Sequence, residues 1–167
     1  LANVSRAVAA RATLPVTQNV LLEGDDGQLK LTATNTEISI STWIGAQIEG
    51  DGRVTVPARM LTDFVNSLPG QTVDIEFKNE PVGVVVTCDK FNGEINGIAS
   101  EEFPPIPTVD GGSSVTIPAD TFRGALERVV LAAATDDSRP VLTGVKVELS
   151  GDTFTLAAAD GFRLAVE

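Results

Sequence analysis

The sequence contains no histidine, no tyrosine and a single cysteine among its 167 residues. The absence of histidine removes the commonest general base and metal ligand. The lone Cys88 excludes an internal disulfide and is compatible with a reducing cytoplasm, which is the expected location. Because Cys88 ends the strand-like segment Val84-Val85-Val86-Thr87-Cys88, we expect a half-buried thiol on a strand.

Several sequence signatures are missing as well. No stretch of about 18 apolar residues is present to span a membrane, and no signal peptide is visible. Phosphate-binding glycine loops, zinc spacings and calcium loops do not occur, so we expect neither cofactor nor metal. The acidic pairs fall in segments with turn composition, where Asp is common for structural reasons. Nothing places a nucleophile beside a base, which favours a protein without catalytic activity.

The most informative feature present is an internal repeat. Residues 1–42 align with residues 126–167 without gaps at a constant offset of 125 residues. A register shared through a helix, a turn and two strands indicates duplicated domains, with the second copy ending inside the unit. The matched positions include Leu1 and Leu126, Val4 and Val129, Ala7 and Ala132, Pro15 and Pro140, Leu31 and Leu156, and Ala33 and Ala158.

A shorter repeat lies inside the first. Residues 54–58 reappear as residues 115–119, an offset of 61 residues. Each time a strand-like triplet meets a proline and then a pattern of apolar residues at helical spacing. We expect Pro57 and Pro118 at the first helical position, where the missing N–H has no intrahelical partner anyway. The domain is therefore expected to be a doubled unit of one helix followed by strands.

The remaining pattern predicts an α+β fold with helices packed on antiparallel sheets. We expect helices over residues 1–11, 58–68 and 119–134, and strands over residues 14–23, 28–34, 37–43, 72–77, 82–88 and 91–97. Gly50-Asp51-Gly52 is expected to close a hairpin. The proline-rich segment 100–107 is predicted to connect the two copies, with Phe103 and Ile106 docked on a domain surface.

The charge is distributed unevenly. The formal net charge is −11, which alone disfavours nucleic acid as a partner. The three helical stretches, however, carry five arginines against Asp63, Asp120 and Glu127, a net +2, which leaves −13 for the rest of the chain. Taken alone, this asymmetry is better explained by ordinary helix-surface arginines.

At this point the sequence resembles the bacterial sliding clamp family, the β subunit of DNA polymerase III. The similar segments follow the family order over nearly the whole chain. They are residues 11–16, 19–22, 32–37, 56–59, 101–104, 138–144 and 159–165, among them Val56-Pro57-Ala58-Arg59, Glu101-Glu102-Phe103-Pro104 and Ala159-Asp160-Gly161-Phe162-Arg163.

The resemblance implies a DNA polymerase processivity factor of three similar domains per chain. Two chains in a head-to-tail homodimer form a ring around duplex DNA, with sheets outside and helices lining the hole. It implies a first clamp domain at residues 1–107 with its start missing, the first half of a second domain at residues 108–167, and no third domain. The expected partners are duplex DNA, the replicative polymerase, the clamp loader and repair proteins.

The resemblance also implies two sets of site residues. The DNA-lining candidates are arginines on the predicted helices: Arg6, Arg11, Arg59, Arg123 and Arg128. Arg11 matches an arginine that contacts DNA in the family, whereas Asp136, at a corresponding rim position, is a poor phosphate ligand. The candidates for binding partner peptides form one wall of a groove: Arg139, Leu142, Ala159, Gly161, Phe162, Arg163 and Leu164.

The groove departs from the family pattern at two positions. Threonine is frequent where Ala159 stands, and histidine or tyrosine where Phe162 stands, so a polar contact to the peptide is expected to be lost. An alternative interpretation makes Phe162 and Leu164 ordinary inward strand residues. For the whole protein, two alternatives remain open: a repeat-built protein-interaction scaffold without DNA encirclement, and an enzyme whose catalytic residues lie outside this sequence.

Overall fold

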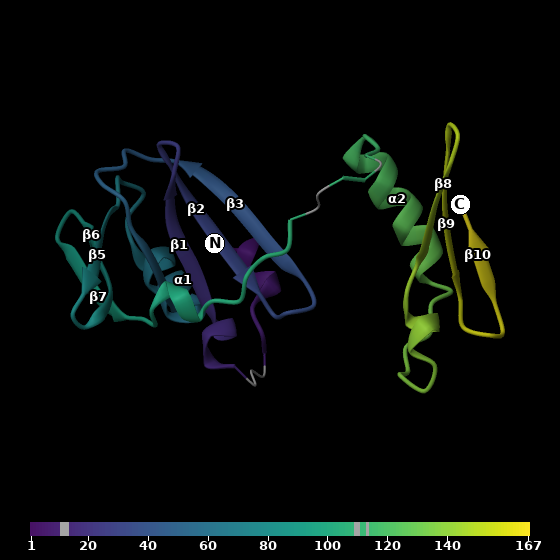
Figure 1. Cartoon of the computed structure of the whole chain (residues 1–167), viewed down its shortest axis with the longest axis horizontal. Coiled ribbons are helices and arrows are strands. Elements are labelled where there is room, and N and C mark those ends of the chain that lie inside the picture. The colour runs from purple at the N-terminus through teal and green to yellow at the C-terminus, as the bar shows by residue number, and fades with distance from the viewer. Residues whose placement is uncertain (11–13, 109–110, 113) are drawn as a thin grey trace. The chain divides into compact units, whose positions relative to one another are not determined.

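The computed structural model describes residues 1–10, 14–108, 111–112 and 114–167. These residues form two compact units, Leu1–Thr108 (unit 1) and Val109–Glu167 (unit 2), which are described separately (Figure 1). Within the described residues, no helix is long and apolar enough to cross a membrane.

Unit 1 contains a four-stranded antiparallel sheet in the order β3-β2-β1-β4. Its strands are β1 (Asn19–Asp25), β2 (Gln28–Thr34), β3 (Ser39–Gly45) and β4 (Arg53–Pro57). The predicted hairpin at Gly50-Asp51-Gly52 is wrong, because β3 pairs only with β2 and β4 pairs with β1 at the other end of the sheet. Residues 46–52 therefore cross from one edge of the sheet to the other.

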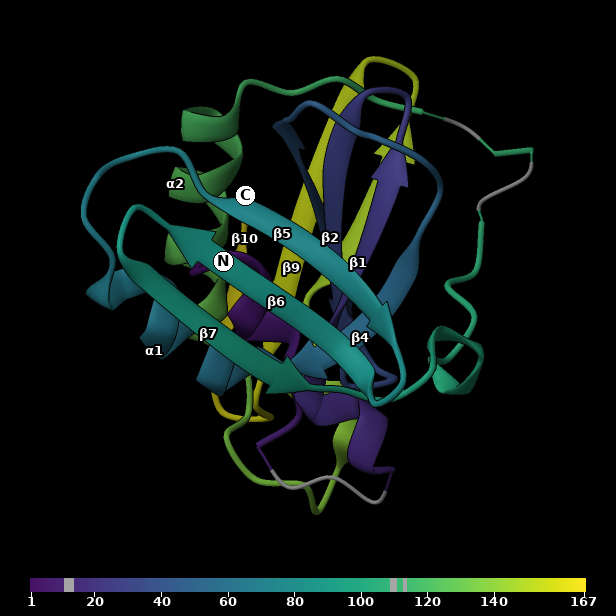
Figure 2. The ribbon, with the colours of Figure 1, turned by 90° about the vertical axis from the view of Figure 1, so that its left-hand side faces the viewer.

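A second sheet of unit 1 has the order β5-β6-β7 and is antiparallel throughout (Figure 2). Its strands are β5 (Asp74–Asn79), β6 (Val82–Cys88) and β7 (Phe91–Asn96). Helix α1 (Ala58–Ser67) packs against it through Phe64, since a Cβ on Gly93 of β7 would lie 2.6 Å from the Phe64 ring. Cys88 lies on β6 as expected and is fully buried.

Both sheets and α1 share one core. Leu22 and Leu31 from the first sheet, Leu61 from α1, and Val84 and Val86 from β6 are all within a few per cent of complete burial in this cluster. Burial of such side chains contributes about 1.5–3 kcal/mol each. The predicted α+β packing of helices on antiparallel sheets is thus confirmed.

The first predicted helix is much shorter than expected. Among the described residues 1–10, only Val4–Ala7 forms a helix (η1), and it is of the 3-10 type. Val4 and Ala7 are buried as the apolar stripe indicated, but Val8 is already extended. The helix ends there because the N–H of Ala9 donates to the oxygen of Thr17, 3.1 Å away, in place of an intrahelical acceptor.

The predicted strand over residues 14–23 is half wrong. Pro15–Gln18 forms a 3-10 turn (η2), and β1 begins only at Asn19. Pro15 stands at the start of this turn, where its fixed φ is favourable and its missing N–H costs nothing. The Thr17 hydroxyl reinforces the turn by donating to the Leu14 oxygen across 2.8 Å.

Unit 2 consists of α2 (Ala119–Val130), a 3-10 turn η4 (Pro140–Thr143) and a three-stranded antiparallel sheet in the order β10-β9-β8. The strands are β8 (Lys146–Ser150), β9 (Thr153–Ala159) and β10 (Leu164–Val166). Val129, Ala132 and Leu156 pack in the core between α2 and β9. Phe122 of α2 and Phe154 of β9 meet edge to face, with ring centroids 5.9 Å apart.

The offset of 125 residues is reproduced in the structure. The turn η2 falls on η4 and β2 falls on β9, residue for residue. Thr34 pairs with Ser39 in unit 1 as Ala159 pairs with Leu164 in unit 2. The inner repeat is less complete, because residues 115–117 form no strand, unlike β4. Pro57 and Pro118 are the N-cap residues of α1 and α2, one position before the one expected.

Candidate functional site

The turn η4 begins the candidate peptide groove. Pro140 starts this turn, the N–H of Leu142 donates to the Arg139 oxygen across 2.9 Å, and the Thr143 hydroxyl donates to the Pro140 oxygen. The oxygen of Leu142 accepts a hydrogen bond from the N–H of Ala134, beyond the end of α2. These bonds hold the Leu142 side chain at the side of the sheet.

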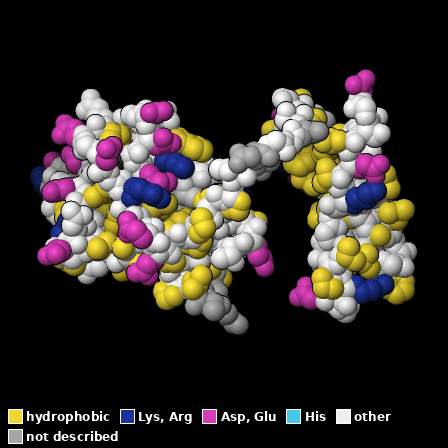
Figure 3. Space-filling view, in the orientation of Figure 1, with side chains coloured by type: hydrophobic (Ala, Val, Ile, Leu, Met, Phe, Trp, Pro, Cys, Tyr) yellow, Lys and Arg dark blue, Asp and Glu magenta, His cyan; other side chains and the backbone are white. Residues whose placement is uncertain are grey.

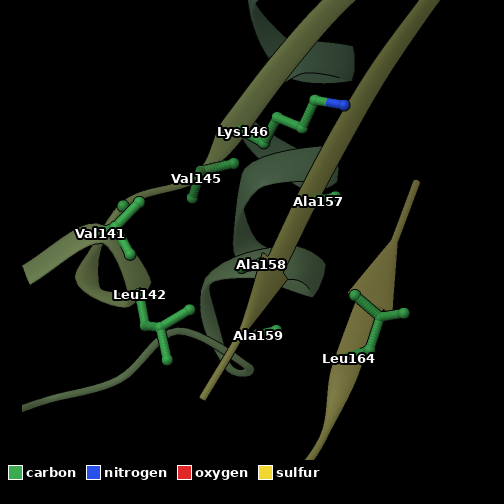
Figure 4. Close-up of a pocket in the computed structure, with 9 residues that line it drawn as sticks. Val141, Leu142, Val145, Lys146, Ala157, Ala158, Ala159 and Leu164 are labelled. Carbon is green, nitrogen blue, oxygen red and sulfur yellow. The ribbon is translucent and has the colours of Figure 1, made fainter. Parts of the chain in front are cut away.

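An apolar groove of about 450 Å³ lies beside η4, on unit 2 (Figure 4). The alanines of β9 lie between Leu142 of η4 and Leu164 of β10. The residues that line it are Val141, Leu142, Gly144, Val145, Lys146, Ala157, Ala158, Ala159 and Leu164. Three of the predicted peptide-binding residues, Leu142, Ala159 and Leu164, are therefore brought together in one cavity.

The loop between β9 and β10 is organised by Asp160. Its Oδ1 accepts hydrogen bonds from the N–H groups of Phe162 and Arg163, at 2.9 and 3.0 Å. Its Oδ2 accepts a third from Nε of Arg163, at 2.8 Å. These bonds, above all those from the two backbone N–H groups, stabilise the ionised carboxylate and hold the pKa of Asp160 below its ordinary value.

Arg139 lies against the same loop. Its Nη2 donates to the backbone oxygen of Asp160 across 3.0 Å. A Cβ at Gly161 would lie 3.0 Å from Nη1 of Arg139, and Gly161 has φ of +93°. Both observations favour glycine at this position, because a side chain would crowd the guanidinium and strain the backbone.

Phe162 and Leu164 point to solvent. Phe162 is 96 % exposed and Leu164 is 69 % exposed, the latter on the edge strand of the sheet. The interpretation that these are ordinary inward strand residues is therefore wrong for this structure. Large apolar side chains with such exposure beside an apolar groove are typical of a surface that binds a partner.

The candidate DNA-lining arginines are all exposed where the structure describes them. Arg59 pairs with Asp63 on α1 at 3.7 Å, and Arg123 pairs with Asp120 on α2 at 2.5 Å. Arg128 forms an ion pair with Glu167, and this hydrogen bond lowers the pKa of the glutamate. Arg6 lies exposed on η1, and Arg11 lies outside the described residues. Exposed ion pairs like these contribute little to stability and are screened by salt.

Comparison with known proteins decides the family. The profile described as the N-terminal domain of the DNA polymerase III β subunit matches residues 1–107, and that of its central domain matches residues 116–167. The chain belongs to the DNA polymerase III β subunit family.

Individual members of this family agree with that assignment. The beta sliding clamp of Synechocystis is 39% identical over 99% of the chain, which corresponds to 44% of the relative's own length. The sliding clamp of Bacillus subtilis superposes with a TM-score of 0.92 at 28% identity, covering 99% of this chain and 45% of that one. A sliding clamp of Pseudomonas aeruginosa bound to griselimycin superposes with a TM-score of 0.88 at 32% identity. The superposition covers 98% of this chain and 44% of that one. The chain thus spans less than half the length of these relatives, and the predicted clamp fold is confirmed.

Several residues of the groove and of the loop beside it were missed by the sequence prediction. Asp160 holds the loop between β9 and β10 through its hydrogen bonds. The sequence signal for such a loop was the Asp-Gly pair between two apolar runs. Val141 and Val145 also line the groove. Their positions in the sequence follow no helical or strand period that would have predicted this. Lys146 is the one charged residue among the lining side chains, and its Nζ forms an ion pair with Glu148 on β8 at 2.5 Å.

Proposed function

We propose that this β subunit relative acts, in its complete protein, as a DNA polymerase processivity factor. In this role a ring-shaped sliding clamp encircles duplex DNA and tethers the replicative polymerase and other partners. The observation that carries the proposal is the consecutive match to two domains of one subunit, with superposition on solved clamps across both. The clamp relatives' names give the function, and the chain contributes less than half of their length.

The proposal assigns the exposed helix arginines to the DNA. In unit 1 these are Arg6 and Arg59, in unit 2 Arg123 and Arg128, and Arg11 is the fifth candidate. Their local ion pairs leave only a small net positive charge. A ring does not need tight phosphate contacts, since a topological link retains it, and weak contacts permit sliding. The acidic remainder of the surface (magenta in Figure 3) disfavours DNA elsewhere.

The proposal assigns the groove on unit 2 to short peptide segments of the polymerase, the clamp loader and repair proteins. An open apolar cavity with few polar groups suits the apolar side chains of such a segment. The exposed Phe162 lies two residues before Leu164, which lines the cavity. The griselimycin-bound relative from Pseudomonas aeruginosa is evidence that clamps of this family bind ligands. Since Ala159 offers no hydroxyl, we expect recognition here by shape and apolar contact.

The proposal includes a head-to-tail homodimer of three-domain chains as the ring, and a role without catalysis. A processivity factor acts by staying on the DNA, which requires a closed ring and not a nucleophile with a base. The catalytic step belongs to the polymerase that the clamp tethers. Neither metal nor cofactor takes part.

One experiment separates a clamp from a scaffold that only binds proteins. The complete protein is loaded by its clamp loader onto nicked circular DNA, washed at high salt, and the DNA is then linearised. We expect retention on the circle and release on linearisation, because salt removes phosphate contacts but does not open a ring. Equal loss from circular and linear DNA, with loading verified, contradicts the clamp and favours the protein-interaction scaffold.

A further inference from the structure

The loop between β9 and β10 repeats the loop between β2 and β3 at the offset of 125 residues. In each loop the side-chain Oδ1 of one residue, Asn35 or Asp160, accepts two backbone N–H groups, at 2.9 and 3.0 Å. The backbone N–H of the same residue donates to the oxygen three positions later, at 3.2 Å in unit 1 and 3.3 Å in unit 2. The next residue has positive φ in both loops, +76° at Thr36 and +93° at Gly161. The two loops therefore share one backbone arrangement.

The loop of unit 1 has an additional hydrogen-bond centre, the hydroxyl of the buried Thr34. This hydroxyl donates to the backbone oxygen of Ile38 at 2.9 Å and accepts a hydrogen bond from the N–H of Thr36 at 3.1 Å. It also accepts a hydrogen bond from the hydroxyl of Ser39 at 2.9 Å. A hydroxyl has one proton to donate and two acceptor lone pairs, so the Thr34 hydroxyl is used completely within the loop.

Unit 2 lacks this hydroxyl, because Ala159 stands where unit 1 has Thr34. The two positions are equivalent in register, since each stands opposite the residue five positions later in its hairpin. An alanine side chain offers neither a donor nor an acceptor. The three bonds of the Thr34 hydroxyl all join residues within five positions of one another, so this difference is set inside each loop and not by the rest of either unit.

The loop of unit 2 is held instead by two arginines. Nε of Arg163 donates to Oδ2 of Asp160 at 2.8 Å, and Nη2 of Arg139 donates to the backbone oxygen of Asp160 at 3.0 Å. In unit 1 the counterparts of both arginines are apolar residues. Exposed charged pairs are weak and are screened by salt. The loop that carries Phe162 thus depends on exposed bonds where unit 1 uses a buried hydroxyl.

We propose that position 159 determines how firmly the β9–β10 loop is ordered, and that Ala159 leaves this loop adjustable so that bound partner peptides exchange. The inference rests on the proposed peptide-binding function of the groove, which Ala159 lines. A hydroxyl at position 159 would serve the loop and not the peptide, because the equivalent hydroxyl in unit 1 gives its one proton to the loop backbone. Ala159 is therefore a positioning residue. Its effect on the peptide passes through the loop, since a segment that must be ordered on binding lowers the affinity.

The test introduces the missing hydroxyl into the complete protein with Ala159→Thr, and Ala159→Val is the matched control. Valine has the shape of threonine without the hydroxyl, so both variants add the same bulk to the groove. We expect the Gly161 amide to exchange its hydrogen about fivefold more slowly in Ala159→Thr than in Ala159→Val, the effect of one net hydrogen bond. In unit 1, Thr34→Val should have the opposite effect and speed the exchange of the Thr36 amide.

Peptide exchange is measured by stopped-flow fluorescence with a labelled hexapeptide that carries two leucines separated by one serine, which suit the apolar floor. This probe should dissociate about fivefold more slowly from Ala159→Thr than from Ala159→Val, because a loop ordered in advance costs less on binding. If Ala159→Thr does not fold, Ala159→Ser carries the hydroxyl with less bulk and is compared with the unaltered protein by the same criteria.

Equal dissociation of the probe from the hydroxyl variant and its control overturns the proposal, and so does equal exchange of the Gly161 amide. Failure of the proposed function gives a different result. Binding of the probe by none of these proteins, the unaltered protein included, refutes the peptide-binding role of the groove, and the proposal falls with it.

Discussion

Arg139 donates a hydrogen bond through Nη2 to the backbone oxygen of Asp160, 3.0 Å away. The two residues belong to different sides of the groove, since Arg139 precedes η4 and Asp160 begins the loop to β10. Because Asp160 also holds the N–H groups of Phe162 and Arg163, one polar assembly connects the turn to the exposed aromatic. The apolar groove thus depends on polar residues at its margin.

Removal of this link is expected to weaken peptide capture. In Arg139→Ala the loop loses its tie to η4, and the affinity for a partner peptide should fall about fivefold, the effect of one net hydrogen bond. Fluorescence anisotropy with a labelled peptide measures this change. Lys90→Ala, an equal change of charge on an exposed turn of unit 1, is the control. Equal loss in both variants would show a general charge effect.

The loop is also expected to depend on pH in a defined direction. The pKa of Asp160 lies below its ordinary value of 3.8, because the carboxylate accepts hydrogen bonds from the backbone N–H groups of Phe162 and Arg163. Its stabilising contribution is therefore complete above pH 3.8 and is lost as the pH falls through the lower folded-state pKa. The amide resonances of Phe162 and Arg163 should titrate below pH 3.8 and not in Asp160→Asn. A midpoint at or above 3.8 contradicts this.

Two exposed apolar residues on different strands test whether the groove residues bind the peptide. Leu164 lines the groove, whereas Val147, 56 % exposed on β8, does not. Leu164→Ala is expected to weaken peptide binding about tenfold, the loss of one buried apolar side chain at about 1.5 kcal/mol. Val147→Ala should leave the affinity unchanged. Calorimetric titration of both variants measures the difference, and equal affinities refute the assignment of Leu164.

Adjacent residues of α1 test the core of unit 1. Leu61 is 2 % exposed and Met60 is 55 % exposed. Leu61→Ala should lower the free energy of unfolding by about 2–5 kcal/mol, because it leaves a cavity between α1 and the sheets. Met60→Ala should change it by less than about 0.5 kcal/mol. Urea denaturation of the unit 1 transition gives both values, and similar losses would argue against the described packing.

An arginine on α2 tests the proposed DNA contact. Arg123→Ala should reduce the slope of log affinity against log salt concentration by about 0.9 if Arg123 contacts one phosphate. Arg53→Ala, whose guanidinium bonds to Glu23 on the first sheet at 2.9 Å, is the control and should not change the slope. The measurement is duplex DNA binding by the complete protein over a range of salt. An unchanged slope in Arg123→Ala removes this residue from the lining.

The sequence predicted the features that depend on local pattern and on the repeat. Strand β2 and helix α1 lie close to where apolar spacing placed them, since their inner faces follow a regular period. Strand β9 lies where the offset of 125 residues places the counterpart of β2. The lost helix turns after Ala7 were not predictable in this way. There the N–H of Ala9 finds its acceptor at Thr17, a contact that no helical or strand period encodes.

The strand pairing and the candidate site were likewise predictable only in part. Gly50-Asp51-Gly52 has turn composition whether the next strand pairs with β3 or crosses the sheet, so the sequence did not distinguish the two. Leu142, Ala159 and Leu164 came from resemblance and do meet in one groove. That Phe103 packs against Val16 and Leu21 depends on contacts between segments distant in the sequence, which no local pattern encodes.

The offset of 125 residues stays constant through a 3-10 turn and three strands of each unit. This limits where the two copies tolerate insertions. A one-residue slip in β2 or β9 would turn every side chain of the strand to the other face, and Leu31 or Leu156 would leave the core. Extra residues are therefore compatible with the fold only in the turns between strands, as at Gly27 and Gly151, where the chain already has positive φ. Loop grafting for labels or cross-linkers should succeed at those two turns and fail one residue inside the strands.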